Sequence, residues 1–83
     1  MKPNEILRLQ FLDTVENQLR IDDPPETSLT LDRLKLEGFS NKEAKELISA
    51  CVAAEMLYVM KSNEPFNRER YLGLLARLPE LPE

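Results

Sequence analysis

The stretch that decides the fold is GFSNKEA, residues 38–44, because it fixes where one helix ends and the next begins. Glycine readily adopts the left-handed conformation that closes a helix, so Gly38 is the predicted end of the preceding helix. Ser40 and Glu43 have the S-x-x-E spacing of a capping box, and Phe39 occupies the hydrophobic-staple position just before it. The sequence therefore predicts two helices that are joined by a tight corner.

Four helical segments are predicted around this corner, and the chain shows no strand pattern or internal repeat. In each segment, apolar residues recur every three or four positions, as they do on a helix with one buried face. Prolines between the segments lack the amide hydrogen that a continuing helix would need. The predicted helices cover residues 4–20, 25–37, 41–61 and 68–78. We expect a single all-α domain over residues 1–83, a compact bundle of four helices with a long third helix.

Two finer details are predicted for these helices. At the start of the second helix, Asp23 is the expected cap, Pro24 suits the first helical position, and Glu26 stands where a capping-box acid would sit. The expected buried stripe of the first helix includes Leu9, and that of the third helix includes Tyr58.

The composition of the 83 residues argues against several kinds of chemistry. The chain has no histidine, which is the commonest general base and nitrogen metal ligand. Its one cysteine, Cys51, cannot build a zinc site of the usual four-ligand kind, and we expect it to be a small buried apolar residue. Two glycines are too few for a glycine-rich phosphate loop. The sequence predicts no enzyme, no cofactor and no metal.

Cysteine content, hydropathy and charge predict the compartment of the chain and the kinds of partner that it binds. A lone cysteine and the absence of a recognisable signal peptide predict a cytoplasmic protein. The longest apolar stretch, residues 50–60, is interrupted by Glu55 and is about half of a membrane span, so no membrane association is expected. The net charge is −4, and only Arg68, Arg70 and Arg77 cluster on one segment. The composition therefore does not predict binding to nucleic acid, because such binding requires a concentrated positive surface.

Glu55 is the residue that breaks the apolar pattern of the third helix. It falls on the predicted buried stripe, where an ionised carboxylate is costly unless it is paired. One interpretation is an ion pair with Arg20, Arg33 or Arg70 that holds two helices together, and another is a position at the edge of the stripe. A third interpretation makes Glu55 part of a ligand or partner site.

The third helix also carries more apolar residues than one buried face requires. Met56, Leu57 and Met60 fall largely off its predicted buried stripe, and similar surplus residues occur on the other helices. These further residues are Ile6, Leu7, Leu29 and Leu36. A helix that is apolar on more than one face is either central in its bundle or covered by a partner. Met56 and Met60 are therefore candidate interaction residues, together with Gly38 and Phe39 of the corner.

Taken whole, the chain resembles a short uncharacterised bacterial helical domain. The matching residues are Asn17-Gln18-Leu19, Asp23-Pro24-Pro25-Glu26, Leu31-x-Arg33-Leu34, Gly38-Phe39-Ser40-x-x-Glu43-Ala44, Ile48, Ala54-Glu55, Lys61, Pro65-Phe66 and Arg70-Tyr71-x-x-x-Leu75. The resemblance implies an all-helical fold and no assigned activity. It also implies histidines in the first and third helices, which this chain lacks, so no metal or acid–base role carries over from them.

A second resemblance is local to residues 34–48, where Leu34-x-x-x-Gly38-Phe39-Ser40-x-x-Glu43-Ala44-x-x-x-Ile48 is similar to the first corner of ubiquitin-associated domains. In those domains a Gly-Phe loop touches the partner, which implies a contact role for Gly38 and Phe39. The predicted third helix is longer than such domains use, and a capping box with a staple produces the same residues without kinship.

Three functions remain as hypotheses from the sequence. The preferred one is a non-catalytic helical module for protein–protein interaction or self-association, either a homodimer or a binder of an unidentified protein. The second is a small nucleic-acid-associated regulator with a helix-turn-helix-like corner, which the acidic start of the third helix disfavours. The third is a carboxylate-dependent enzyme or ligand site, in which burial raises the pKa of Glu55.

Overall fold

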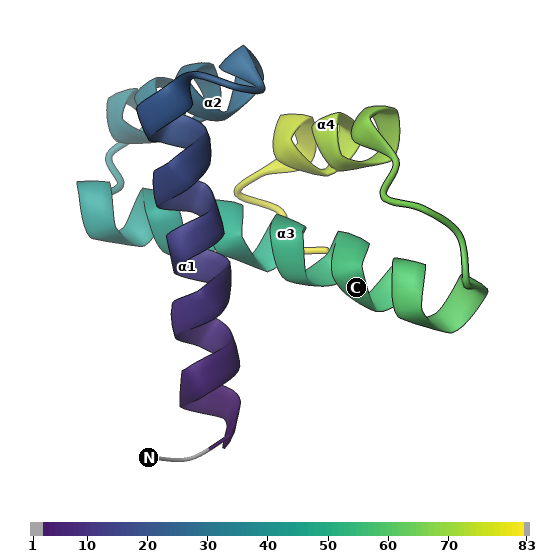
Figure 1. The fold of residues 1–83 in the computed structure, drawn as a ribbon. Helices are drawn as coiled ribbons and strands as arrows, with labels where there is room; N and C mark the ends of the chain where they lie inside the picture. Colours follow the sequence, from purple (N-terminus) through teal and green to yellow (C-terminus); the bar gives the residue numbers. More distant parts are fainter. Residues whose placement is uncertain (1–2, 83) are drawn as a thin grey trace.

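The computed structural model describes the backbone of residues 3–82 and the side chains of residues 9–82. It contains four helices, α1 (Pro3–Ile21), α2 (Pro25–Leu36), α3 (Asn41–Ser62) and α4 (Arg68–Arg77), and the described residues form no strand (Figure 1). The prediction of an all-α bundle with a long third helix is confirmed. All four expected ranges lie within one residue of these bounds.

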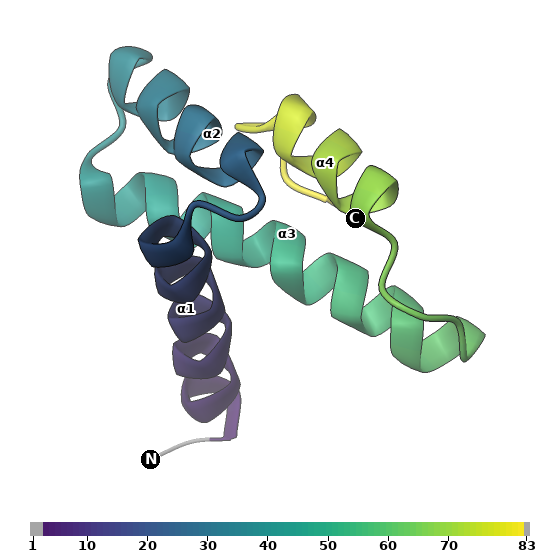
Figure 2. The ribbon, with the colours of Figure 1, turned by 45° about the horizontal axis from the view of Figure 1, so that its top comes forward.

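The central element of the bundle is α3, which contacts each of the other three helices. In Figure 1, α1 crosses α3 steeply, and its N-terminal half extends beyond the crossing. Figure 2 shows α2 and α4 on the same side of α3, and these two helices also contact each other. In the described part of the chain, the neighbours of the C-terminal half of α3 are α4, the loop that precedes α4 and the segment that follows it (Figures 1 and 2).

The corner between α2 and α3 forms as the sequence predicts. Gly38 has a φ of +107°, and its N–H donates to the carbonyl of Lys35 at 3.1 Å. The N–H of Phe39 donates to the carbonyl of Leu34, also at 3.1 Å, which completes the Schellman arrangement at the end of α2. At the start of α3, the Glu43 N–H donates to the Ser40 hydroxyl and the Ser40 N–H donates to the Glu43 carboxylate. The capping box is therefore complete.

The predicted range of α2 begins at the correct residue, 25, but the residues expected at its cap and first helical position are displaced by one. The N-cap is Pro24, with φ −75° and ψ 148°, and Pro25 is the first helical residue. No side chain caps this end, so Asp23 is not the cap that the sequence led us to expect. The reason is that a residue before a proline is disfavoured in the helical region, and Pro25 therefore keeps Pro24 extended. The Asp23 carboxylate instead lies 3.4 Å from the Arg68 guanidinium.

The core is a single cluster of apolar side chains drawn from all four helices. Its buried members are Val15, Leu34, Ala44, Ile48, Cys51, Val52, Tyr71, Leu75 and Leu78. Two predictions about the buried stripes are wrong, because Leu9 and Tyr58 are exposed. Leu9 belongs to the N-terminal half of α1 that extends past α3, and Tyr58 instead lies under the guanidinium of Arg70. Of the surplus apolar residues, Leu29 and Leu36 are exposed, and the side chains of Ile6 and Leu7 lie outside the described residues.

Two buried polar connections tie α4 to the other helices. The Arg33 guanidinium on α2 donates to the carbonyls of Leu75 and Leu78, at 3.0 and 2.8 Å, and so caps the end of α4. The side-chain carbonyl of Gln18 on α1 accepts one hydrogen bond from Thr27 and one from Tyr71, each of 2.8 Å. Sequence periodicity gave no sign of either connection.

We predict opposite effects for the same substitution at the two glycines. Gly38→Ala forces a side chain into a left-handed backbone and should lower the free energy of unfolding by about 1–2 kcal/mol. Gly73→Ala lies within α4, where added helix propensity should raise that free energy by about 0.5–1 kcal/mol. A Cβ at either position meets no atom within 4 Å, so steric overlap does not obscure the comparison. Urea unfolding of both variants measures the two shifts, and shifts of the same sign would contradict this account.

Candidate functional site

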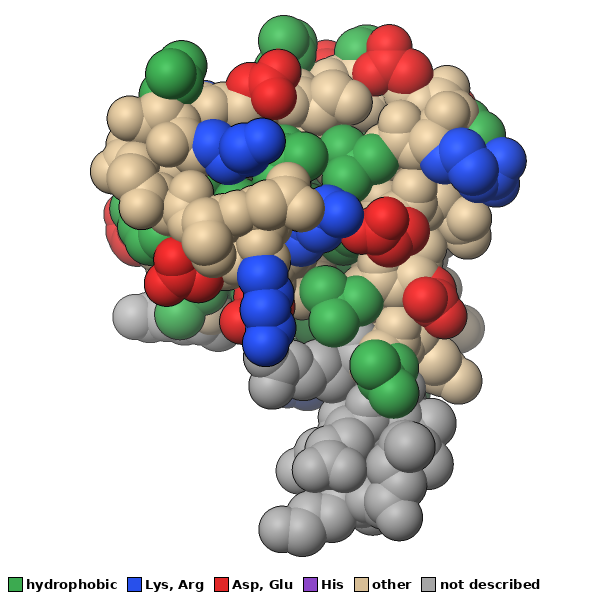
Figure 3. Space-filling view, turned by 90° about the vertical axis from the view of Figure 1, so that its left-hand side faces the viewer, with side chains coloured by type: hydrophobic (Ala, Val, Ile, Leu, Met, Phe, Trp, Pro, Cys, Tyr) green, Lys and Arg blue, Asp and Glu red, His purple; other side chains and the backbone are tan. Residues whose placement is uncertain are grey.

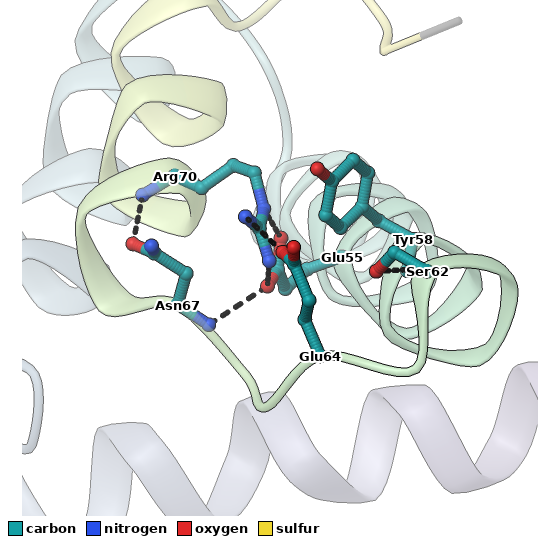
Figure 4. Close-up of polar contacts among 6 residues, drawn as sticks. All are labelled: Glu55, Tyr58, Ser62, Glu64, Asn67 and Arg70. Atoms are coloured by element: carbon teal, nitrogen blue, oxygen red, sulfur yellow. Dashed lines mark hydrogen bonds and ion pairs between the residues drawn. The ribbon is translucent and has the colours of Figure 1, made fainter.

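The Glu55 carboxylate is the most enclosed charged group among the described side chains, with 1% of the residue exposed. Its Oε1 accepts from Arg70 Nε at 2.7 Å, and its Oε2 accepts from Arg70 Nη2 at 2.7 Å (Figure 4). Oε2 also accepts the backbone N–H of Asn67 at 2.8 Å. The pairing is therefore bidentate, a geometry in which two parallel hydrogen bonds add to the attraction between the charges. Of the three arginines considered from sequence, Arg70 is the partner.

Local structure at the start of α4 brings these groups together. The Asn67 side chain caps α4 by accepting the N–H of Arg70 at 3.0 Å, and the Asn67 backbone N–H donates to Glu55. The Arg70 guanidinium lies over the Tyr58 ring, 3.8 Å from its centroid, and Nη1 lies 3.9 Å from the Glu64 carboxylate (Figure 4). The guanidinium is thus held between a carboxylate, a ring and a second acid.

These contacts keep Glu55 ionised. The hydrogen bonds from Arg70 lower the pKa of the Glu55 carboxyl, burial raises it, and the Asn67 N–H and the charge of Arg70 lower it further, with a net decrease. The same pair raises the pKa of Arg70. The third hypothesis from the sequence requires a net increase in the pKa of Glu55, but the net shift is a decrease, because the hydrogen bonds to the charged form outweigh desolvation. A carboxylate in this state holds no proton to donate at neutral pH.

Two other buried groups with acidic protons are held in their neutral forms. Burial raises the pKa of the Cys51 thiol to about 12. Burial also raises the pKa of Tyr71 to about 12, although hydrogen bonds with Thr27 and Gln18 act in the opposite direction. A thiolate is the reactive form of cysteine, so Cys51 is not an activated nucleophile in this fold.

Two concavities lie near charged residues. A cavity of about 440 Å³ opens beside the ion pair and is bounded by Tyr58, Arg77 and Glu80 among others. A wider hollow of about 650 Å³ lies between α1, α2 and the start of α3, with Leu19 and Leu31 among its lining residues and Glu16 and Lys45 paired beside it. Figure 3 shows that acidic and basic side chains are mixed on this side of the molecule.

The three arginines of α4 are each paired with an acid. Arg68 lies near Asp23 and Glu26, Arg70 binds Glu55, and Arg77 is 2.8 Å from Glu80. These contacts neutralise much of the local positive charge that the sequence places on the last helix. The cluster is therefore a set of ion pairs, and it does not form the concentrated cationic surface typical of phosphate binding.

The candidate interaction residues occupy opposite ends of α3. Gly38 and Phe39 lie at its start, and Phe39 is partly buried against the core. Met56 and Met60 lie in its C-terminal half, with 37% and 76% of each residue exposed. The structure does not bring these pairs together, so the corner and the end of α3 cannot form one site.

The side of α3 that faces away from Glu55 has no charge over three turns. We define the α3 strip as Ala50, Ala53, Leu57 and Met60, which lie about 140–220° around the helix axis from Glu55. The two alanines are partly exposed, and Leu57 and Met60 are 54% and 76% exposed. Between residues 50 and 60 the only charged side chain is that of Glu55, which points inward. A solvent-facing helix surface normally carries charged side chains, and this one does not.

No protein-family model matches the chain, and the comparisons with curated proteins and with solved structures found no match. The resemblances to a bacterial helical domain and to ubiquitin-associated domains thus remain predictions. Among the described residues, no group of three or more histidine, cysteine, aspartate or glutamate side chains is placed to hold a metal ion. No helix in the described part of the chain has the length and apolar character needed to span a membrane.

We predict that Glu55 makes folding stability depend on pH in the acidic range. Because the pKa of Glu55 is lower in the folded chain than its ordinary value of 4.5, its contribution is fully present above that value and is lost as the pH falls. Glu55→Gln should cost about 2–3 kcal/mol at pH 7 and should flatten this part of the pH profile. Urea unfolding at several pH values between 3 and 7 compares the two chains.

The matched control for this experiment is Glu69→Gln, which removes an exposed acid from α4, the helix that carries Arg70. The Ser40 groups lower the pKa of Glu43, so part of the acid dependence should persist in every variant. If Glu55→Gln and the wild-type chain lost stability in parallel as the pH fell, the ionised pair would not be the source.

We also predict that Cys51 is unreactive in the folded chain. With the residue fully buried and the pKa of its thiol about 12, an aromatic disulfide reagent at pH 8 should modify it only after unfolding. Absorbance at the reagent's thiolate band, recorded with and without urea, measures the difference. Rapid modification without urea would show that the core opens easily.

Proposed function

We propose that the protein is a non-catalytic helical interaction module that binds another protein through the α3 strip. The observation that carries this proposal is the uncharged outer face of α3 from Ala50 to Met60, whose only charged residue is turned into the core. Contiguous apolar surface that is free of charge commonly marks a protein-binding site. The flanking Met56, also partly exposed, adds an adaptable side chain to the edge of the strip.

The energetics of the strip favour a helical or flat partner. Fully burying a leucine or methionine side chain stabilises a complex by about 1.5–3 kcal/mol. A partner that covers the exposed parts of Leu57 and Met60 would gain a fraction of this free energy. Ala50 and Ala53 allow a second backbone to approach closely, so dispersion contacts add to the transfer term. The complex is therefore expected to be specific in shape but modest in affinity.

Other functions have less support from the same residues. An acid–base enzyme at Glu55 would need a pKa near the working pH, whereas the Arg70 pairing lowers the pKa of Glu55. A nucleic-acid regulator would need unpaired cations, whereas the arginines of α4 are ion-paired. A reducing compartment such as the cytoplasm is part of the proposal, because Cys51 is a free thiol.

We predict that a photo-crosslinking amino acid at position 57 captures a protein in cells that produce the chain. The control places the same residue at position 36, where Leu36 is 90% exposed on α2. A discrete adduct from position 57, absent from position 36, is the expected result on denaturing gels. If both positions gave the same diffuse pattern, or position 57 gave none, the α3 strip would not be a binding surface.

A further inference from the structure

We infer that the protein bound by the α3 strip is a second copy of this chain, with the two α3 helices packed antiparallel. The inference rests on the proposed function and names its partner. It arises from the distribution of size and charge along α3, which makes this face complementary to itself when one copy is reversed.

The sizes of the strip residues are graded along the helix. Ala50 and Ala53 stand at its N-terminal end and Leu57 and Met60 at its C-terminal end, at alternating spacings of three and four residues. This spacing is that of a helix–helix seam. In an antiparallel pair, Leu57 packs on Ala53 of the second copy and Met60 packs on its Ala50. Each large side chain then meets a small one, whereas a parallel pair would place alanine on alanine and leave a gap.

The charges that border the strip have opposite signs at its two ends. Continuing the seam towards the N-terminus leads to Glu46, and the residue after Met60 is Lys61, which is exposed. Reversal of the second helix therefore brings Lys61 of each copy within side-chain reach of Glu46 of the other. A two-fold axis makes both contacts at once, as it does in the isologous dimers that predominate among soluble oligomers.

The bundle leaves this face open. Glu55, on the opposite side of α3, is held by Arg70, so α4 packs away from the strip. Lys45 and the buried Ser49 mark the side that faces α1, where Lys45 is paired with Glu16. The strip is turned away from α4 and borders the side that faces α1, with Leu57 and Met60 exposed and Ala50 and Ala53 partly exposed.

Sedimentation equilibrium of the purified full chain tests the inference. We expect a reversible dimer with a dissociation constant of about 1–100 μM. Leu57→Glu should raise that constant at least about a hundredfold, because it places two carboxylates in an apolar interface. Leu36→Glu, equally polar but on α2, should leave it unchanged. A chain that stayed monomeric up to roughly 1 mM would overturn the inference.

Charge reversal tests the antiparallel arrangement separately. Glu46→Lys and Lys61→Glu should each weaken the dimer about tenfold, because each creates two like-charge contacts across the axis. The double variant should recover the wild-type constant, since it exchanges the charges of both contacts. Circular dichroism and thermal melting verify that each variant is folded. If Glu46→Lys perturbs the helix, the dissociation constant of the Lys61→Glu variant is the measurement that tests the pairing. A double variant as weak as the single ones would overturn the antiparallel pairing.

The two proposals fail in different ways. If position 57 crosslinks to a different protein in cells while the purified chain is monomeric, self-pairing is overturned and the interaction function stands. If the purified chain is monomeric and position 57 yields no adduct, both are overturned.

Discussion

The pairing of Glu55 with Arg70 is the constraint on which the rest of the structure depends. A carboxylate with 1% of its residue exposed requires partners, and its three hydrogen bonds come from two residues at the start of α4, Asn67 and Arg70. The two Arg70 bonds and the Asn67 bond fix where α4 begins and how it faces α3. Tyr71, one residue after Arg70, is thereby turned into the core, and Leu75 follows one turn later. A single buried charge thus sets the position of a ten-residue helix.

Polar connections of this kind carry much of the specificity in a small core. Nine of the described apolar residues form the fully buried cluster, and apolar contacts alone tolerate several relative placements of four helices. Arg33 caps the end of α4, and Gln18 links α1 to both α2 and α4. The bonds that reach α4 join residues 42 to 53 positions apart in the sequence. A hydrogen bond has a required direction and length, which a hydrophobic contact has not. These bonds therefore select one arrangement from those that bury similar area.

The sequence predicts the elements of this fold better than their mutual arrangement. Helix limits depend on local signals, and the capping box at Ser40 and the left-handed Gly38 formed as expected. Glu55 was identified from its place in the apolar pattern. Its partner, Arg70 and not Arg20 or Arg33, can be identified only when the three-dimensional arrangement of the helices is known. Leu9 and Tyr58 have the spacing of buried residues yet are exposed, because periodicity does not show where a neighbouring helix stops. The role of Gln18 left no signal, since a glutamine on a helix is ordinarily solvated.

The α3 strip is exposed because the Glu55–Arg70 ion pair fixes which side of α3 faces the core. Between residues 50 and 60 an ordinary surface helix would turn its charge outward and its leucine and methionine inward. Here Glu55 is held inward by Arg70, and the geometry of an α-helix then directs the residues two and five positions later to the opposite side. Leu57 and Met60 are exposed for this reason, although they are among the most apolar residues of α3. Outward apolar residues lower the solubility of a lone chain and strengthen an interface. Arg70 offsets the cost of burying the Glu55 charge, and the outer face of α3 between residues 50 and 60 is left apolar.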